Sequence, residues 1–303
     1  MGTLAASRAL RGAALPRRGK GRRLSPGAAV AVPAAPSTDY DGLAAWLEGE
    51  GFRTVFSYRG PSPVDRARAL EDAFADPEVG AVLFAERSRS ATEYVRHLDY
   101  ELLAENPKPF AGSDLATAMH AALGRGADLV TFWAPPAHEL GAADSATRRA
   151  LLRALTGFDA GRSGESGELA AVPIVSGIAE GELVGGDVSE LSLLMGTLWE
   201  IDTRGKIVLL VAPRRAPWHV GRHLLHLANA GKLQEAAGIC LAGLGDGGAA
   251  VEIAEAMVKP LGIPAVRGLP VGNGSRLATV PLGARVRLDA YDGRLELLEP
   301  GVR

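Results

Sequence analysis

The sequence predicts an α/β protein with two parts: an amino-terminal parallel sheet with flanking helices, and a smaller, strand-rich carboxy-terminal domain. At 303 residues the chain is long enough for two domains. Apolar runs alternate with amphipathic helical segments through the first half, which is typical of a parallel sheet covered on both faces. The second half ends in two alternating apolar runs around Asp292-Gly293, the pattern of a β-hairpin.

The expected elements of the first half follow one another in order. Strands are expected at 28–36, 53–58, 81–85 and 128–133, and helices at 43–52, 62–76, 113–123 and 144–155. Ser62 can cap the second of these helices while Pro63 takes its first position, and Asp76-Pro77 ends it.

A break in periodicity divides the chain. Residues 157–173 are rich in glycine and charge and lack a hydrophobic period, which indicates a linker. We therefore expect an amino-terminal α/β domain at 24–156, a linker at 157–176 and a carboxy-terminal domain at 177–303. The elements expected beyond the break are strands at 205–211 and 238–243, helices at 219–231 and 249–262, and the hairpin at 285–298.

The first 23 residues differ from the rest in charge. They carry seven lysine and arginine residues, and no acid precedes Asp39. Such a segment cannot bury a core, so we predict that residues 1–23 form a dispensable, disordered tail. The charges interrupt the apolar region that a secretory signal needs, so the protein is expected to be cytoplasmic.

Composition argues against several classes of partner. No apolar run reaches 18 residues, so no membrane span is expected, and a net charge of −2 gives no reason to expect nucleic acid. A single cysteine excludes a multi-cysteine metal site. His219, His223 and His226 could share one helical face, but no pair of acids lies nearby and Arg222 lies among them, which favours a solvated basic face. We expect neither a cofactor nor a metal.

Polar residues follow three of the expected parallel strands. The loops read ERSRSATE after residue 85, GSD at 112–114 and APPAHE after residue 133. Ligand sites of open α/β sheets lie at these carboxyl ends. Arg87 and Arg89 could hold a carboxylate or phosphate. Ser113 is either a nucleophile at a strand-to-helix turn or the cap of the following helix, and spacing alone favours the cap.

Six segments together resemble one family. They are LSPGAAVAVPAAPS, RARALEDAFADPEVGAVLFA, LDYELLAENPKPFAGSDLATAMHAAL, ELVGGDVSELSLLMGTLWEIDTRGKIVLLV, GLPVGNG and VPLGARVRLD. Their order and spacing over residues 24–290 resemble the LD-carboxypeptidases, serine peptidases that include the microcin-immunity type enzymes. The resemblance implies a two-domain hydrolase, commonly dimeric. Its relatives release a terminal D-amino acid from murein tetrapeptide or cleave amide-linked nucleotide antibiotics. The implied mechanism is a Ser-His-Glu triad, with glycine amides forming the oxyanion hole.

The residues that carry this chemistry are substituted here. The family stretch PKPFIGYSDITALHLAL aligns without gaps on residues 107–123, which places Asp114 at the nucleophile position. A one-residue deletion would restore Ser113 but shift the helix behind it. The family glutamate falls at Val211 and the histidine at Asn273, while the family's glycine-rich ARGGYG loop reads AERSRS at 85–90. Because triad members act as a unit, we expect the serine-peptidase chemistry to be lost and Ser113 to act as a cap.

Three functions remain open. In the first, the former active site binds a peptide-like or nucleotide-like ligand without hydrolysis. Its contacts would be Arg87, Arg89, Asp114, Asp187 and Asn273. In the second, a divergent enzyme reuses Asp114, whose ionised form is favoured at a helix amino terminus. In the third, an active carboxypeptidase uses Ser113 with another base, for which His138 is the candidate.

Overall fold

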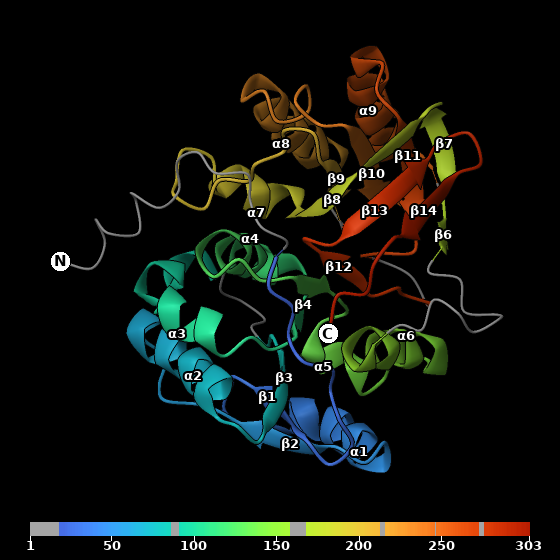
Figure 1. Ribbon diagram of the computed structural model, residues 1–303. Helices are drawn as coiled ribbons and strands as arrows, with labels where there is room; N and C mark the ends of the chain where they lie inside the picture. The colour runs from blue at the N-terminus through green and yellow to red at the C-terminus, as the bar shows by residue number, and fades with distance from the viewer. Residues whose placement is uncertain (1–17, 86–90, 158–167, 213–215, 246, 273–275) are drawn as a thin grey trace.

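The structure is a computed structural model that describes residues 18–85, 91–157, 168–212, 216–245, 247–272 and 276–303. It contains two sheets, one of six strands and one of eight, each with helices packed against it (Figure 1). The expected α/β class with a strand-rich second part is confirmed. Every helix in these ranges is too short or too polar to cross a bilayer.

The amino-terminal sheet has the order β12-β5-β4-β3-β1-β2. Its strands are β1 (Ala29–Val32), β2 (Arg53–Phe56), β3 (Val79–Leu83), β4 (Phe110–Gly112), β5 (Thr131–Trp133) and β12 (Val280–Leu282). The first five run parallel, and β12 adds to β5 in the antiparallel direction. The sheet is therefore completed by a strand from the far end of the chain.

Helices cover both faces of this sheet. One face packs on α2 (Pro63–Ala75), α3 (Tyr100–Glu105) and α4 (Thr117–Gly126). The other face packs on α1 (Asp41–Gly49), α5 (Ala137–Leu140) and α6 (Ser145–Thr156). Short 3-10 turns lie at η1 (Thr38–Tyr40), η2 (Ala91–Glu93), η3 (Val95–His97) and η4 (Asp114–Ala116). As predicted, α2 begins at Pro63, and the Ser62 side chain accepts a hydrogen bond from the Asp65 amide.

The carboxy-terminal sheet has the order β6-β14-β13-β8-β9-β10-β11-β7. Its strands are β6 (Glu168–Ala170), β7 (Val172–Val175), β8 (Ile178–Asp187), β9 (Ile207–Val211), β10 (Gly238–Ala242), β11 (Ala265–Leu269), β13 (Arg285–Asp289) and β14 (Arg294–Leu297). Strands β13 and β14 form the hairpin predicted from Asp292-Gly293. The two edge strands, β6 and β7, are separated only by Ala171, so the sheet curls until its edges approach each other.

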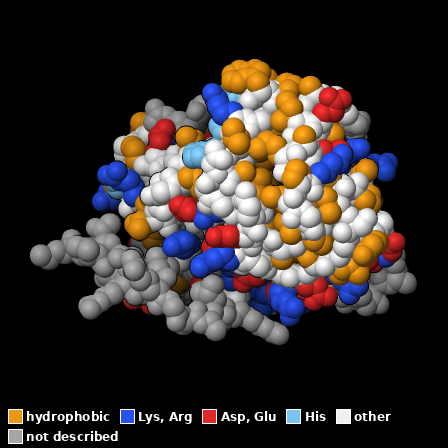
Figure 2. Space-filling view, turned by 90° about the horizontal axis from the view of Figure 1, so that it is seen from above, with side chains coloured by type: hydrophobic (Ala, Val, Ile, Leu, Met, Phe, Trp, Pro, Cys, Tyr) orange, Lys and Arg blue, Asp and Glu red, His pale blue; other side chains and the backbone are white. Residues whose placement is uncertain are grey.

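Each face of this sheet has its own apolar cluster. On one face lie α7 (Val188–Leu193), α8 (Pro217–Asn229), α9 (Ala249–Val258) and the turn η5 (Lys259–Leu261). The inner face packs against Trp133 of β5 and against β12. Seen from above this domain, basic and acidic side chains lie close together and apolar side chains are scattered between them (Figure 2).

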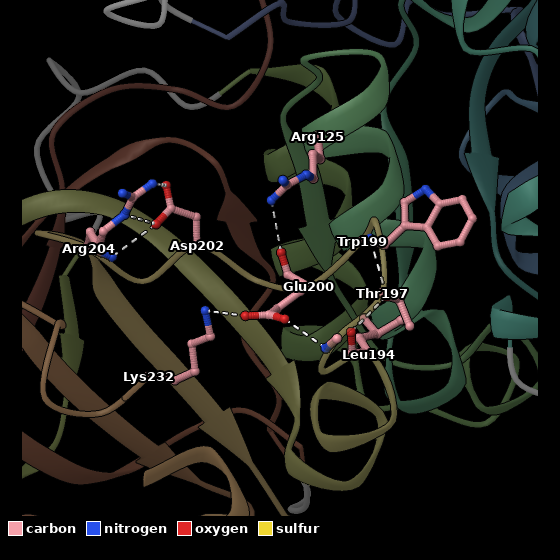
Figure 3. A network of polar contacts seen from close by, with 9 residues as sticks. Arg125, Leu194, Thr197, Trp199, Glu200, Asp202, Arg204 and Lys232 are labelled. Atoms are coloured by element: carbon pink, nitrogen blue, oxygen red, sulfur yellow. Dashed lines mark hydrogen bonds and ion pairs between the residues drawn. The ribbon is translucent and has the colours of Figure 1, made fainter. Parts of the chain in front are cut away.

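The connection from α7 to β9 binds the two parts together (Figure 3). Leu194 and Trp199 pack on the same apolar cluster as α3 and α4. The Glu200 carbonyl accepts a hydrogen bond of 3.2 Å from Arg125 at the end of α4, and the Glu200 carboxylate pairs with Lys232. This hydrogen-bonded pair with Lys232 lowers the pKa of Glu200. The connection is thus anchored on both domains.

Two of the expected segment limits differ from the structure. Residues 168–170 and 172–175, expected within a linker, form the edge strands β6 and β7. Residues 18–23, expected in the dispensable tail, pack against the protein. The Gly19 amide donates to the Asp128 carbonyl at 2.6 Å, and the Arg23 amide donates to the Arg303 carbonyl at 3.1 Å. A basic composition suggests disorder only while the charges are unpaired, and Arg18 pairs here with Glu182 at 3.4 Å.

Truncation tests the role of residues 18–23. Deleting residues 1–23 should lower the free energy of unfolding by about 2 kcal/mol or more relative to deleting residues 1–17, because only the longer deletion removes these hydrogen bonds. Urea denaturation of the two truncated proteins measures the difference. Equal stabilities would mean that the tail is dispensable up to residue 23.

Candidate functional site

The chain makes a sharp corner after β4. Ser113 is extended, with φ −134° and ψ 180°, and Asp114 follows with φ +45° at the start of η4. Among the described non-glycine residues, only Asp114 and Asp128 have a positive φ. This conformation is costly for a residue with a Cβ, although aspartate tolerates it better than most. α/β-Hydrolases place their nucleophilic serine on a strained strand-to-helix turn of this kind. The strained position in this chain belongs to Asp114.

Close packing beneath the corner requires a glycine. A Cβ on Gly112 would lie 2.6 Å from the Phe84 Cβ and 2.9 Å from the Ala116 Cβ. Strand β4 can therefore approach β3 and the turn η4 only without a side chain at this position.

A buried histidine ties the corner to the helix and strand that follow. The His120 Nε2 lies 3.0 Å from the Gly112 carbonyl, and its Nδ1 lies 2.9 Å from the Thr131 Oγ1. The carbonyl can only accept, so Nε2 carries the proton and Nδ1 accepts from the Thr131 hydroxyl. Burial lowers the pKa of His120 to about 4, which keeps the ring neutral. His120 thus fixes the strand end and is almost fully buried.

A threonine joins the corner to the second domain. The Thr117 hydroxyl donates to the Asp114 carbonyl at 2.7 Å and accepts from the Asp187 amide at 3.0 Å. Gly186 lies so close that a Cβ there would be 2.5 Å from the Thr117 Cγ2. The end of β8 therefore supports the strained residue through Thr117. The sequence analysis did not single out Thr117, although its position three residues after the corner is suited to such a bond.

Asp187, expected as a ligand contact, is fully buried and serves the fold. Its Oδ1 accepts from the amides of Ser189 at 2.8 Å and Glu190 at 3.1 Å, so it caps α7. The Ser189 hydroxyl also donates to the same oxygen. These bonds all use Oδ1, one of the two carboxylate oxygens.

The position of the family glutamate lies beside Asp187. Val211 pairs with Asp187 across β8 and β9 and is fully buried in the inner apolar cluster. A Cβ on Gly272 would meet the Val211 Cγ1 at 2.6 Å, so residue 211 adjoins the segment leading to Asn273. Gly272 therefore lies against Val211, and an aliphatic side chain occupies the aligned position of the family glutamate.

The other predicted residues are placed as follows. Arg87, Arg89 and Asn273 lie outside the described residues. His138 lies in α5, with its Nε2 3.9 Å from the Glu139 carboxylate. The expected cap by Ser113 is wrong: its side chain makes no capping hydrogen bond. The side-chain oxygen of an N-cap residue accepts a hydrogen bond from an amide in the first turn of its helix. Here the strained corner at residue 114 separates Ser113 from α4, which begins only at Thr117.

The histidines of α8 form a polar and aromatic surface. The rings of His219 and His223 stack with centroids 6.0 Å apart, and Arg222 donates to His219 at 3.2 Å. His226 bonds the Ser192 hydroxyl at 3.0 Å. In the part of the chain that the structure describes, no three potential metal ligands gather in one place.

Comparison with known proteins gives a consistent picture. Residues 25–134 match the model of the LD-carboxypeptidase N-terminal domain, and residues 180–288 match that of the C-terminal domain. A "Probable murein peptide carboxypeptidase" of Bacillus subtilis (strain 168) is 31% identical over 265 residues, covering 84% of this chain and 82% of that protein.

Solved structures share the fold. The structure of MccF in complex with glutamyl sulfamoyl guanosine is 18% identical, with a TM-score of 0.81, and the match covers 94% of this chain and 99% of that one. A muramoyltetrapeptide carboxypeptidase from Oxalobacter formigenes is 24% identical, with a TM-score of 0.76, over 89% of this chain and 97% of that one.

Substitution of Thr117 tests how the corner is held. Thr117→Val should lower the free energy of unfolding by about 1–3 kcal/mol, because the buried Asp187 amide loses its acceptor. Thr117→Ser keeps the hydroxyl and serves as the matched control in urea denaturation. If both variants lose the same stability, the hydroxyl has no special role.

The lowered pKa of the buried His120 predicts how the free energy of unfolding depends on pH. The folded pKa of about 4 lies below the ordinary value of 6.5, so His120 contributes full stability above pH 6.5 and loses it as the pH falls toward 4. Between pH 7 and pH 4.5 this loss should be about 2 kcal/mol. Urea denaturation of His120→Gln should show a smaller loss over the same interval, whereas the exposed His97→Gln should behave like the parent protein. An unchanged pH dependence in His120→Gln would contradict the assignment.

Proposed function

The chain belongs to the LD-carboxypeptidase family, and we propose that it binds a peptide-like or nucleotide-like ligand at the Asp114 corner without serine-peptidase catalysis. The observation that carries the proposal is the positive φ at Asp114. It supports the gapless alignment, in which no serine holds the nucleophile position. Ser113, one residue earlier, has the extended backbone of a strand residue.

The surroundings of Val211 support the loss of the triad. A serine nucleophile needs a base within hydrogen-bond reach, and that base needs an orienting acid. Val211 is enclosed in an apolar cluster and offers no acceptor. Asn273, at the aligned position of the base, cannot take up a proton near neutral pH. Ser113 alone would supply little of the rate of peptide hydrolysis, because triad residues act together.

The ligand class follows from relatives. One relative is named for murein peptides, and a structural neighbour holds glutamyl sulfamoyl guanosine. A carboxylate at the corner suits the amino group that both kinds of molecule carry. The homodimer implied by the resemblance and the cytoplasmic location expected from the sequence both stay predictions.

A divergent enzyme that reuses Asp114 is the second candidate. The strained corner favours it, because backbone strain is concentrated at functional sites. A carboxylate there could attack an acyl carbon or a phosphorus without the base that a serine requires; the bond to the leaving group would break as a mixed anhydride forms, and water would then hydrolyse the anhydride.

Hydrolysis and binding are measured separately. With murein tetrapeptide, the purified protein should release no D-alanine above the blank. Release that disappears in Ser113→Ala would overturn the proposal and establish a carboxypeptidase, and release that disappears only in Asp114→Ala would establish the divergent enzyme.

Calorimetric titration then tests binding of murein tetrapeptide and of glutamyl sulfamoyl guanosine. Asp114→Asn should weaken binding of at least one of them about tenfold, through loss of a charge-assisted hydrogen bond. Asp128→Asn is the matched control. Asp128 also has a positive φ, +52°, but it lies before β5, at the amino ends of the strands and not at their carboxyl ends. Equal affinities of Asp114→Asn and the parent would remove Asp114 from the site.

A further inference from the structure

Three residues form a row across the strand ends beside the corner. Gly112, Trp133 and Val280 are paired across β4, β5 and β12. One step further toward the carboxyl edge, the same register aligns Ser113, Ala134 and Thr279. The Ala134 amide still donates to the Gly112 carbonyl at 3.0 Å, so the ladder continues into this row. The row therefore lies at the edge where α/β sheets bind ligands.

The three side chains point to one face of the sheet. Successive residues of a strand alternate between faces, and residues aligned across strands share a face. Ala111, Phe132 and Ala134 belong to the cluster beneath α1, α5 and α6. Ser113 and Thr279 therefore face the same side, away from His120 and α4.

Both hydroxyls of the row are buried without a partner. Ser113 and Thr279 are each 8% exposed, and within the described residues neither Oγ1 of Thr279 nor Oγ of Ser113 has a hydrogen-bond partner. Leaving a hydroxyl unsatisfied away from water is costly, and native proteins rarely do so without a reason.

The backbone holds these hydroxyls in place. Ser113 is fixed between the β4 ladder and the strained corner. Thr279 lies two residues after Leu277. The Leu277 amide donates to the buried Thr147 hydroxyl of α6 at 2.9 Å. The backbone near Thr279 is thus held through Leu277, and that at Ser113 through the β4 ladder and the corner, so both hydroxyls stay at this end of the strands.

We propose that the Ser113 and Thr279 hydroxyls form a subsite for the uncharged amide groups of a peptide-like ligand. A hydroxyl both donates and accepts, which matches the N–H and C=O groups of an amide. The two hydroxyls carry no charge, which suits an amide better than a phosphate. Two strand spacings separate them, about 10 Å, a span that an extended peptide covers in three residues. The inference deepens the proposed function and depends on it for the position of the ligand.

The test compares Ser113→Ala and Thr279→Val with a matched control. Thr203→Val removes another buried hydroxyl that lacks a partner among the described residues, but it precedes β9 at the opposite end of that strand. Calorimetric titration with murein tetrapeptide should show affinity about two- to tenfold weaker for each subsite variant and unchanged for the control. The melting temperature of the unliganded variants should equal or exceed that of the parent, because an unsatisfied hydroxyl is removed.

Each of the other outcomes overturns the subsite, its amide assignment or both proposals. Unchanged tetrapeptide affinity in both subsite variants overturns the subsite, while the effect of Asp114→Asn still decides the proposed function. A clear fall in the melting temperature of both unliganded subsite variants, absent in Thr203→Val, shows that the hydroxyls stabilise the fold. This result also overturns the subsite. Binding of glutamyl sulfamoyl guanosine but not of the tetrapeptide overturns the amide assignment alone. Binding of neither ligand overturns both proposals.

Discussion

The Thr117 hydroxyl connects the strained corner to the second domain, and the arrangement of the site depends on this connection. It donates to the Asp114 carbonyl and accepts from the Asp187 amide. Asp187 in turn caps α7, and its strand partner Val211 adjoins Gly272. One buried side chain thus sets the position of the corner relative to the strands that would carry the rest of the triad. A residue with φ +45° keeps that conformation only while its surroundings hold it there.

The contacts that maintain this arrangement are separate from the groups that would perform hydrolysis. Three glycines allow the close approaches. A Cβ added to Gly185 would lie 1.9 Å from the Leu209 carbonyl oxygen. A Cβ on Gly186 would lie 2.5 Å from Thr117, and one on Gly112 would lie 2.6 Å from Phe84. None of these glycines takes part in proton transfer. Position 211, by contrast, lies in an apolar cluster, where valine avoids the desolvation cost of a carboxylate. The fold therefore depends on these glycines more than on a carboxylate at position 211, so the scaffold does not require the triad chemistry.

Local patterns in the sequence predicted the local structure well. The Ser62 cap, the buried strand β3 and the hairpin around Asp292-Gly293 each depend on residues close together in the chain. Pairings between distant segments carry no such signal. Nothing in residues 280–282 indicates that β12 completes the amino-terminal sheet, and the linker-like composition near residue 168 concealed two edge strands. The cap expected at Ser113 failed for a related reason, since the backbone at residue 114 depends on contacts from β8.

The alignment at the corner shows how backbone geometry can decide what sequence matching leaves open. Two registers were compatible with the residues, one with Ser113 and one with Asp114 at the nucleophile position. A strand-to-helix corner places its positive φ on a single residue, and the helix behind it fixes which one, because His120 must reach both Gly112 and Thr131. Shifting the register by one residue would turn His120 by about 100° around the helix axis and break both bonds. His120 is therefore the residue that assigns Asp114 to the corner and leaves Ser113 in line with the strand, where its hydroxyl faces the other side of the sheet.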